Sequence, residues 1–243
     1  MLLNPPLSET TALRHLTVRA VVDLPLIRGA GHGDAHAIKA LFCGFWPFVR
    51  DFQTLVRSDT FFPIDPLITR YGRAATVQTL RFMKTSLDQM AKEEGLHAEL
   101  WRKGAHEAGF DVDALRGPWL PAVDTLLSFP RNHSPSSKNP HLFFCHLAAT
   151  EYGAEEISRF LVQQEAFIRW FPESKRWHWG DIHLLDHGHG PSHLMIDEDL
   201  AQAYCPHPDP AAVVSEVIAH CISLFAQAGQ EAIELFPSAK API

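Results

Sequence analysis

The sequence of 243 residues lacks an excess of basic residues, and this shortage excludes several partners. Its formal net charge is −7 and its isoelectric point is near 6.1. Because an acidic surface is not attracted to phosphate backbones or anionic lipids, we expect neither nucleic acid nor a membrane as a partner. A small molecule or another protein is favoured instead.

Cysteine is also scarce, and targeting signals are absent. The four cysteines are far apart and form no Cys-x-x-Cys pair, so the sequence predicts neither a disulfide framework nor a zinc ribbon. The N-terminus has no basic-then-apolar signal, and no apolar run approaches the roughly 20 residues of a membrane helix. We therefore expect a cytoplasmic protein with reduced thiols and no membrane segment.

Alternating strand patterns and internal repeats are almost absent, whereas helical periodicity is common. We expect an all-helical fold of one domain, because the length is large for one domain and small for two. Proline or glycine interrupts or ends several of the periodic segments. The expected helices cover about 34–57, with a kink at Pro47, then 66–108, 111–127, 141–170, 174–190 and 210–236.

A Glu-x-x-His pair lies in the second expected helix. Glu94 and His97 are three residues apart and therefore project from one face of a helix. Helical bundles present ligands to iron in this way, because a carboxylate can bridge two ions while an imidazole anchors one. Surface helices also contain this spacing by chance, and Glu93 is an alternative to Glu94.

The stretch HLLDHGHGPSH at 183–193 is unusually rich in histidine. If it is helical, His183, Asp186 and His189 step by three residues and occupy one arc of about 120°. Two imidazoles and a carboxylate suit Fe(II), whereas structural zinc sites usually include thiolates and calcium or magnesium prefers oxygen. A solvated histidine-rich helix is the competing interpretation, and nearby glycine and proline weaken the helical pattern.

A third candidate is a glutamate within an apolar helix. Glu151 lies among small and apolar residues of the segment AATEYGAEEISRFL. A carboxylate in such surroundings is costly unless it is paired or binds a metal. Glu155, one turn further on, is the alternative, although Glu155 and Glu156 are more simply explained as the solvent side of the helix.

Together, these three segments resemble the metal-binding segments of the heme-oxygenase-like diiron oxidases. In that family six ligands come from three core helices in a similar order, ending in a segment that holds His, Asp and His together. The resemblance covers about 74–193 in its motifs and 1–243 in helix layout and length. The matching residues are Glu94, His97, Glu151, His183, Asp186 and His189.

The resemblance implies a single-domain seven-helix bundle, similar to heme oxygenase and to the TenA and PqqC proteins, that binds two Fe(II) ions. Members use O2 as co-substrate to oxidise small amino-acid-like or carboxylic-acid substrates in natural-product biosynthesis. The reactions include N-oxygenation, oxidative rearrangement and carbon–carbon cleavage. The implied partners are a small-molecule substrate and an external electron donor, and the resemblance allows a homodimer.

By the same resemblance, Glu94 and Glu151 would be bridging or terminal carboxylates and His97 would anchor one ion. His183, Asp186 and His189 would chiefly bind the other. The sequence also departs from the family. His183 and Asp186 are three residues apart where members often show four.

A second departure concerns a further glutamate that some members use from an earlier helix. This chain has no glutamate at positions 10–92. The residues that could replace it are His36, Asp51 and Asp59.

Two other functions remain open. A TenA-like, metal-free hydrolase would need a nucleophilic cysteine beside an acidic residue, and Cys145 precedes Glu151 on the same expected helix. A non-catalytic helical binding protein would hold no metal, so mutation of the six matching residues would change only its stability.

Several aromatic residues suggest, loosely, where a substrate could bind. They could line an apolar pocket around an oxidant that must be kept dry, although aromatic residues at helical spacing are more often plain core. These residues are Phe42, Phe45, Trp46, Phe48 and Trp101.

Overall fold

The computed structural model describes residues 3–7, 11–56, 63–116, 119–132, 139–184 and 192–236. These residues form helices and no strand, which confirms the all-helical prediction. The helices are α1 (Thr11–Thr17), the π-helix η2 (Val18–Val22), α2 (Pro25–Gly31), α3 (Ala35–Val56), α4 (Asp65–Tyr71), α5 (Arg73–Glu107), α6 (Pro121–Asn132), α7 (Pro140–Leu161), α8 (Glu165–Ile168), α9 (His178–Ile182), α10 (His193–Tyr204) and α11 (Pro210–Leu235).

Two of the expected helices form within a residue or two of their expected bounds. These are α3, which continues through Pro47, and α11. In length and composition α11 could also cross a membrane, the one such helix among the residues described. It packs against α3, α6 and α7, and core helices of water-soluble proteins often meet the same criteria.

Two other expected helices are divided. The segment 66–108 forms α4 and α5, because Gly72 between them has a φ of 80°, a left-handed conformation that a helix does not tolerate. The segment 141–170 forms α7 and the short α8, separated by a turn after Leu161. These breaks raise the number of helices above the seven that the resemblance implied.

The helix expected over 111–127 was wrong in its first half, since α6 begins at Pro121. The Asp111 carboxylate instead accepts a hydrogen bond from the backbone N–H of Asp113, a local bond that competes with helix formation. The helix expected over 174–190 is reduced to α9, and Lys175 before it has a φ of 53°. Residues 185–191 lie outside the described part of the chain.

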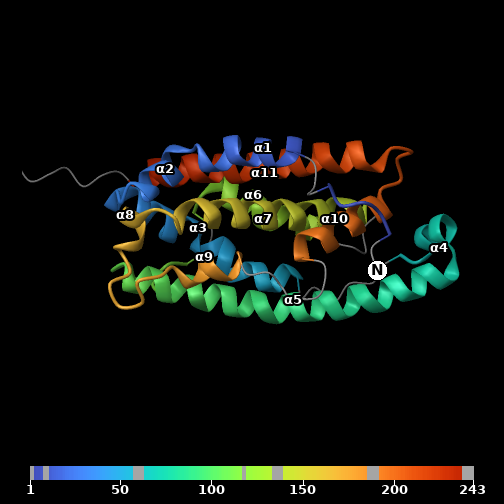
Figure 1. The fold of residues 1–243 in the computed structure, drawn as a ribbon, viewed down its shortest axis with the longest axis horizontal. Helices are drawn as coiled ribbons and strands as arrows, with labels where there is room; N and C mark the ends of the chain where they lie inside the picture. Colours follow the sequence, from blue (N-terminus) through green and yellow to red (C-terminus); the bar gives the residue numbers. More distant parts are fainter. Residues whose placement is uncertain are drawn as a thin grey trace, which may run out of the picture.

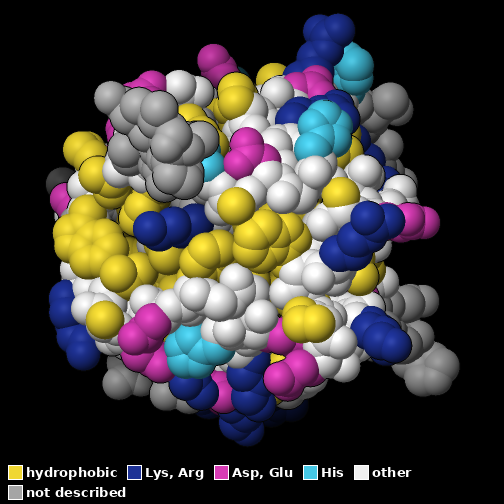
Figure 2. All heavy atoms as spheres, turned by 90° about the vertical axis from the view of Figure 1, so that its left-hand side faces the viewer, with side chains coloured by type: hydrophobic (Ala, Val, Ile, Leu, Met, Phe, Trp, Pro, Cys, Tyr) yellow, Lys and Arg dark blue, Asp and Glu magenta, His cyan; other side chains and the backbone are white. Residues whose placement is uncertain are grey.

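Helix α7 runs through the middle of the molecule, with α11 and α1 on one side and the long α5 on the other (Figure 1). Helix α10 packs along α7 and also touches α5, while α9 contacts both α5 and α7. The buried apolar side chains form one continuous cluster across these helices. At the end of the bundle where α2 and α8 lie, exposed hydrophobic side chains are interspersed with charged ones (Figure 2).

Candidate metal centre

Side chains from three helices converge at one buried place. Glu94 of α5, Glu151 of α7 and His193 of α10 each present a possible ligand atom, and these three atoms lie within 4.8 Å of one another. A mixture of carboxylate and imidazole suits a transition metal better than calcium or magnesium, which prefer oxygen alone. The structure thus brings together two of the predicted residues and a histidine that was not among the predicted ligands.

Glu94 and His97 lie side by side on one face of α5, as their spacing predicted. His97 Nδ1 is 3.2 Å from Glu94 Oε1, but the two atoms are not aligned for a hydrogen bond. Two atoms bound to one ion at about 2.1 Å lie roughly 3 Å apart when the angle between them is near 90°. The arrangement therefore resembles two ligands that share an ion more than an ion pair.

The two ring nitrogens of His193 face different carboxylates. Nε2 lies 3.0 Å from Glu93 Oε2, and Nδ1 lies 3.8 Å from Glu151 Oε1. Glu93 also accepts a hydrogen bond from Gln89 Nε2, at 2.8 Å. Metal-binding histidines commonly use one ring nitrogen for the ion and hold the other with a carboxylate. This geometry favours Glu94 as the ligand and Glu93 as the residue that orients His193.

His183 is the residue that follows α9, so it lies at the end of a short helix and not inside the helix that was expected over 174–190. Its Nδ1 lies 2.7 Å from the backbone oxygen of Trp179, and because a carbonyl only accepts, the neutral ring has its lone pair on Nε2. Its ring lies 4.6 Å from the His97 ring, centroid to centroid. Asp186 and His189 lie outside the described residues and stay predictions.

Asp197 is the most unusual residue of this region. It lies one turn from His193 on α10, its side chain is 0% exposed, and neither carboxylate oxygen has a hydrogen-bond partner among the described residues. Burial raises its pKa well above the usual value, and the charges of Glu151, Glu198 and Glu94 raise it further. A buried carboxylate without a partner is costly, and a bound cation would remove that cost.

Glu151 shares this electrostatic problem. Burial raises its pKa well above the usual value, and the nearby charges of Glu94, Glu155 and Glu93 add to the effect. Glu155, its alternative in the sequence, instead forms an ion pair with Arg159 and lies 3.8 Å from Arg14. The geometry therefore favours Glu151 as the ligand.

The two acidic residues after Asp197 have partners of their own. Glu198 accepts a hydrogen bond from the buried hydroxyl of Tyr152, at 2.7 Å. Asp199 accepts hydrogen bonds from the backbone N–H groups of Leu3 and Asn4, at 2.9 and 2.7 Å. These contacts fix α10 against α7 and the N-terminal segment, so Asp197 is held where it is.

Sequence analysis missed His193 and Asp197 because it placed no helix over 193–204. Two signals were present in the sequence. The first is Ser192, because serine often caps the N-terminus of a helix. In the structure its side chain accepts a hydrogen bond from the backbone N–H of Met195. A His and an Asp four residues apart then share one helix face.

Other residues that the sequence offered do not join the cluster. Asp51 is held by Arg50 through hydrogen bonds of 2.7 and 2.9 Å, and His36 is not among the clustered residues. Asp59 lies outside the described residues. The Cys145 thiol is 0% exposed, and burial raises its pKa well above the usual value, which opposes formation of the nucleophilic thiolate.

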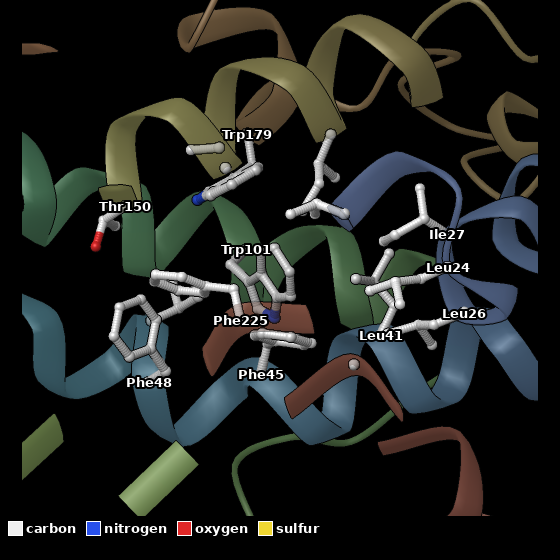
Figure 3. A pocket seen from close by; sticks show the side chains of 16 residues that line it. Leu24, Leu26, Ile27, Leu41, Phe45, Phe48, Trp101, Thr150, Trp179 and Phe225 are labelled. Carbon is white, nitrogen blue, oxygen red and sulfur yellow. The ribbon is translucent and has the colours of Figure 1, made fainter. Parts of the chain in front are cut away.

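An apolar cavity of about 60 Å³ lies beside the centre. Phe45, Phe48 and Trp101 line it, as do the side chains of Thr150 and Trp179 (Figure 3). The other two aromatic residues of the predicted pocket, Phe42 and Trp46, are buried but do not line it.

No protein-family model matches the sequence, and no curated protein matches it. Among solved structures, a TenA homolog from Pseudomonas syringae pv. tomato str. DC3000 is similar with a TM-score of 0.68 and 16% sequence identity. The match covers 96% of this chain and 98% of that chain. The fold is therefore TenA-like, as the resemblance implied, and at this identity the similarity concerns the fold alone.

Proposed function

We propose that this protein is a non-heme diiron oxidase or oxygenase. It would activate O2 to oxidise a small amino-acid-like or carboxylic-acid substrate by N-oxygenation, oxidative rearrangement or carbon–carbon cleavage in a biosynthetic pathway. The observation that supports the proposal most is the buried carboxylate of Asp197, which lies near Glu94 and Glu151 and has no hydrogen-bond partner among the described residues.

The donor set fits two iron ions. Three carboxylates and three imidazoles lie in this region, and helical bundles likewise bind dinuclear iron with carboxylates and imidazoles from facing helices. The carboxylates offset most of the positive charge of two Fe(II) ions, so the buried centre would be close to neutral. The residues that would hold the ions are Glu94, His97, Glu151, His183, His193 and Asp197, with Asp186 and His189 retained from the sequence prediction.

When bound, two Fe(II) ions supply electrons and open coordination positions for the activation of O2. The protein side chains position those ions. Glu93 orients the His193 ring, and the Trp179 carbonyl fixes the ring of His183. The rings of Trp101 and Trp179 pack edge to face at 4.9 Å beside His183, and their apolar surfaces help to exclude water from this region.

Anaerobic titration of the apoprotein with Fe(II), followed by exposure to O2, tests the proposal. We expect about two irons per chain, with a transient absorption band in stopped-flow experiments and oxidation to Fe(III) in Mössbauer spectra. Glu151→Gln should lose both iron uptake and the band. The matched control Glu155→Gln, one turn away on α7, should retain them, because Glu155 faces arginines.

Competition with Zn(II) and Mn(II) in the same titration identifies the preferred metal. Specific uptake of Fe(II) that is not followed by oxidation to Fe(III) on exposure to O2 would contradict an oxidase. If the protein takes up no metal specifically, these residues form an ordinary buried polar cluster and not a metal centre. In that case the metal-free hydrolase and the non-catalytic binding protein would be the remaining functions.

A further inference from the structure

Gly153 lies in the interior of α7, where glycine destabilises a helix because it loses more backbone freedom than other residues do. At most other described glycine positions, the structure explains why a larger residue would be unfavourable. Three have a positive φ, and most of the helical ones would place a Cβ atom within 3.0 Å of a neighbouring atom. A Cβ atom at Gly153 would meet nothing within 4 Å. Neither conformation nor close packing therefore requires glycine here.

The space in front of Gly153 is the apolar cavity. Gly153 is buried and lines the cavity together with Thr150, Ala154 and Ile157, which lie on the same face of α7. Its volume of about 60 Å³ is less than half of the roughly 150 Å³ of a cavity that holds benzene, so it suits a short apolar group. The described lining contains no charged side chain.

One end of the cavity lies next to the candidate metal ligands. Thr150 directly precedes Glu151, and the Trp179 ring packs 4.0 Å from the ring of His183. Figure 3 shows Thr150 at one end of the cavity and the aliphatic side chains of α2 at the other. An extended molecule could therefore place one end near the metal ligands and the other near α2.

Trp179 offers a polar group at the end of the cavity near the metal ligands. Its indole Nε1–H is buried and has no hydrogen-bond partner among the described residues. A buried donor without an acceptor is unfavourable, so this N–H is suited to a polar group of a ligand.

We propose that this cavity holds the apolar part of the substrate, a short alkyl chain, and that Gly153 sets the limit of its length. The inference rests on the proposed function only in identifying the ligand as the substrate of the iron centre. The reacting group would lie at the Trp179 end, because that end is beside His183 and offers an indole N–H that has no partner among the described residues.

Calorimetric titration of the metal-free protein with the 1-alkanols from ethanol to octanol tests this inference without iron or catalysis. Affinity should rise about fourfold for each added methylene and stop rising when the cavity is full. Gly153→Ala should end this rise about one carbon earlier. Gly153→Leu, which fills most of the space, should abolish binding.

Gly104→Ala is the matched control. It adds the same methyl group to another buried helical glycine, where the new Cβ would lie 3.4 Å from Trp177, an ordinary contact outside the cavity. Both alanine variants should gain stability from higher helix propensity. Only the Gly153 variant should change the dependence of affinity on chain length.

Three outcomes separate this inference from the iron proposal. Alkanol binding that is equal in the wild type and in Gly153→Ala at every length would overturn the length limit. Normal iron uptake without any alkanol binding would overturn the cavity as a binding site and leave the iron centre intact. A length series that shifts in Gly153→Ala, in a protein that takes up no iron, would support the cavity and refute the oxidase.

Discussion

Replacement of Asp197 by asparagine should stabilise the metal-free protein and weaken its binding of iron. In the metal-free fold this carboxyl group is buried near Glu94 and Glu151 and has no described hydrogen-bond partner. An unpaired buried charge costs about 3–5 kcal/mol, whereas an unsatisfied neutral polar group costs about 1–3 kcal/mol. Because asparagine has the same shape and no charge, we expect a gain of about 1–3 kcal/mol near neutral pH.

The gain should depend on pH in a defined direction. Burial raises the pKa of Asp197 in the folded state, so the folded protein holds this proton more tightly than the unfolded chain does. Stability from this group is therefore present at low pH and declines as pH rises above the unfolded pKa of about 3.9. Asparagine does not titrate, so the advantage of Asp197→Asn should increase from acid towards alkaline pH.

With iron bound, the wild type should be more stable than Asp197→Asn. Loss of residues that only support a ligand costs about 10–100-fold in metal affinity, so loss of a ligand should cost more than about 100-fold. At iron concentrations of about 1,000 times Kd, binding stabilises the wild type by about 4.1 kcal/mol, which exceeds the expected gain of the variant. The variant should gain little from the same addition.

Urea denaturation between pH 6 and 9, under anaerobic conditions with and without Fe(II), measures both effects. Asp199→Ala is the matched control on the same helix, because it removes the acceptor of the hydrogen bonds from the backbone N–H groups of Leu3 and Asn4. That variant should lose about 1–3 kcal/mol and retain iron binding. If Asp197→Asn destabilises the metal-free protein as the control does, or binds iron normally, Asp197 is not a metal ligand.

Three further variants test neighbouring features. Glu93→Gln should lower iron affinity about tenfold or more without changing the stoichiometry, because Glu93 orients His193. Unchanged affinity in Fe(II) titrations would argue against this role. Burial lowers the pKa of His146 from 6.5 to about 3, so the wild type should lose stability as pH falls through this interval, by about 1.4 kcal/mol per pH unit. His146→Phe should flatten that loss in urea titrations, and equal acid sensitivity in both proteins would contradict the reasoning. Cys145→Ala should retain O2-dependent activity, and loss of activity with iron still bound would favour the cysteine hydrolase.

The helical class of the fold and the helices α3 and α11 could be predicted from the sequence, because apolar residues recur along them at clear helical intervals. The break between α4 and α5 at Gly72 could not be predicted from the sequence. A single glycine inside a periodic segment is compatible with a continuous helix, and only its φ of 80° shows that the chain turns there.

Part of the candidate site could also be predicted. Glu94 and His97 share a helix face whatever surrounds them, and Glu151 is unusual because its neighbours are apolar. Asp197 escaped prediction for a physical reason. Every residue of α10 from Ile196 to Tyr204 is buried, so the helix has no polar stripe and no amphipathic period.

The position of α10 also resolves a departure from the resemblance. His183 and Asp186 are three residues apart where members of the family often show four, but His193 and Asp197 are four apart and occupy one face of a described helix. Under the proposed function, His193 and Asp197 would therefore supply the His-Asp pair at the spacing of the family. Leu200 lies three residues beyond Asp197, where a second histidine of this helix is absent. His183, whose ring lies 4.6 Å from the ring of His97, would be the third described imidazole of the centre, and Asp186 and His189 stay predictions.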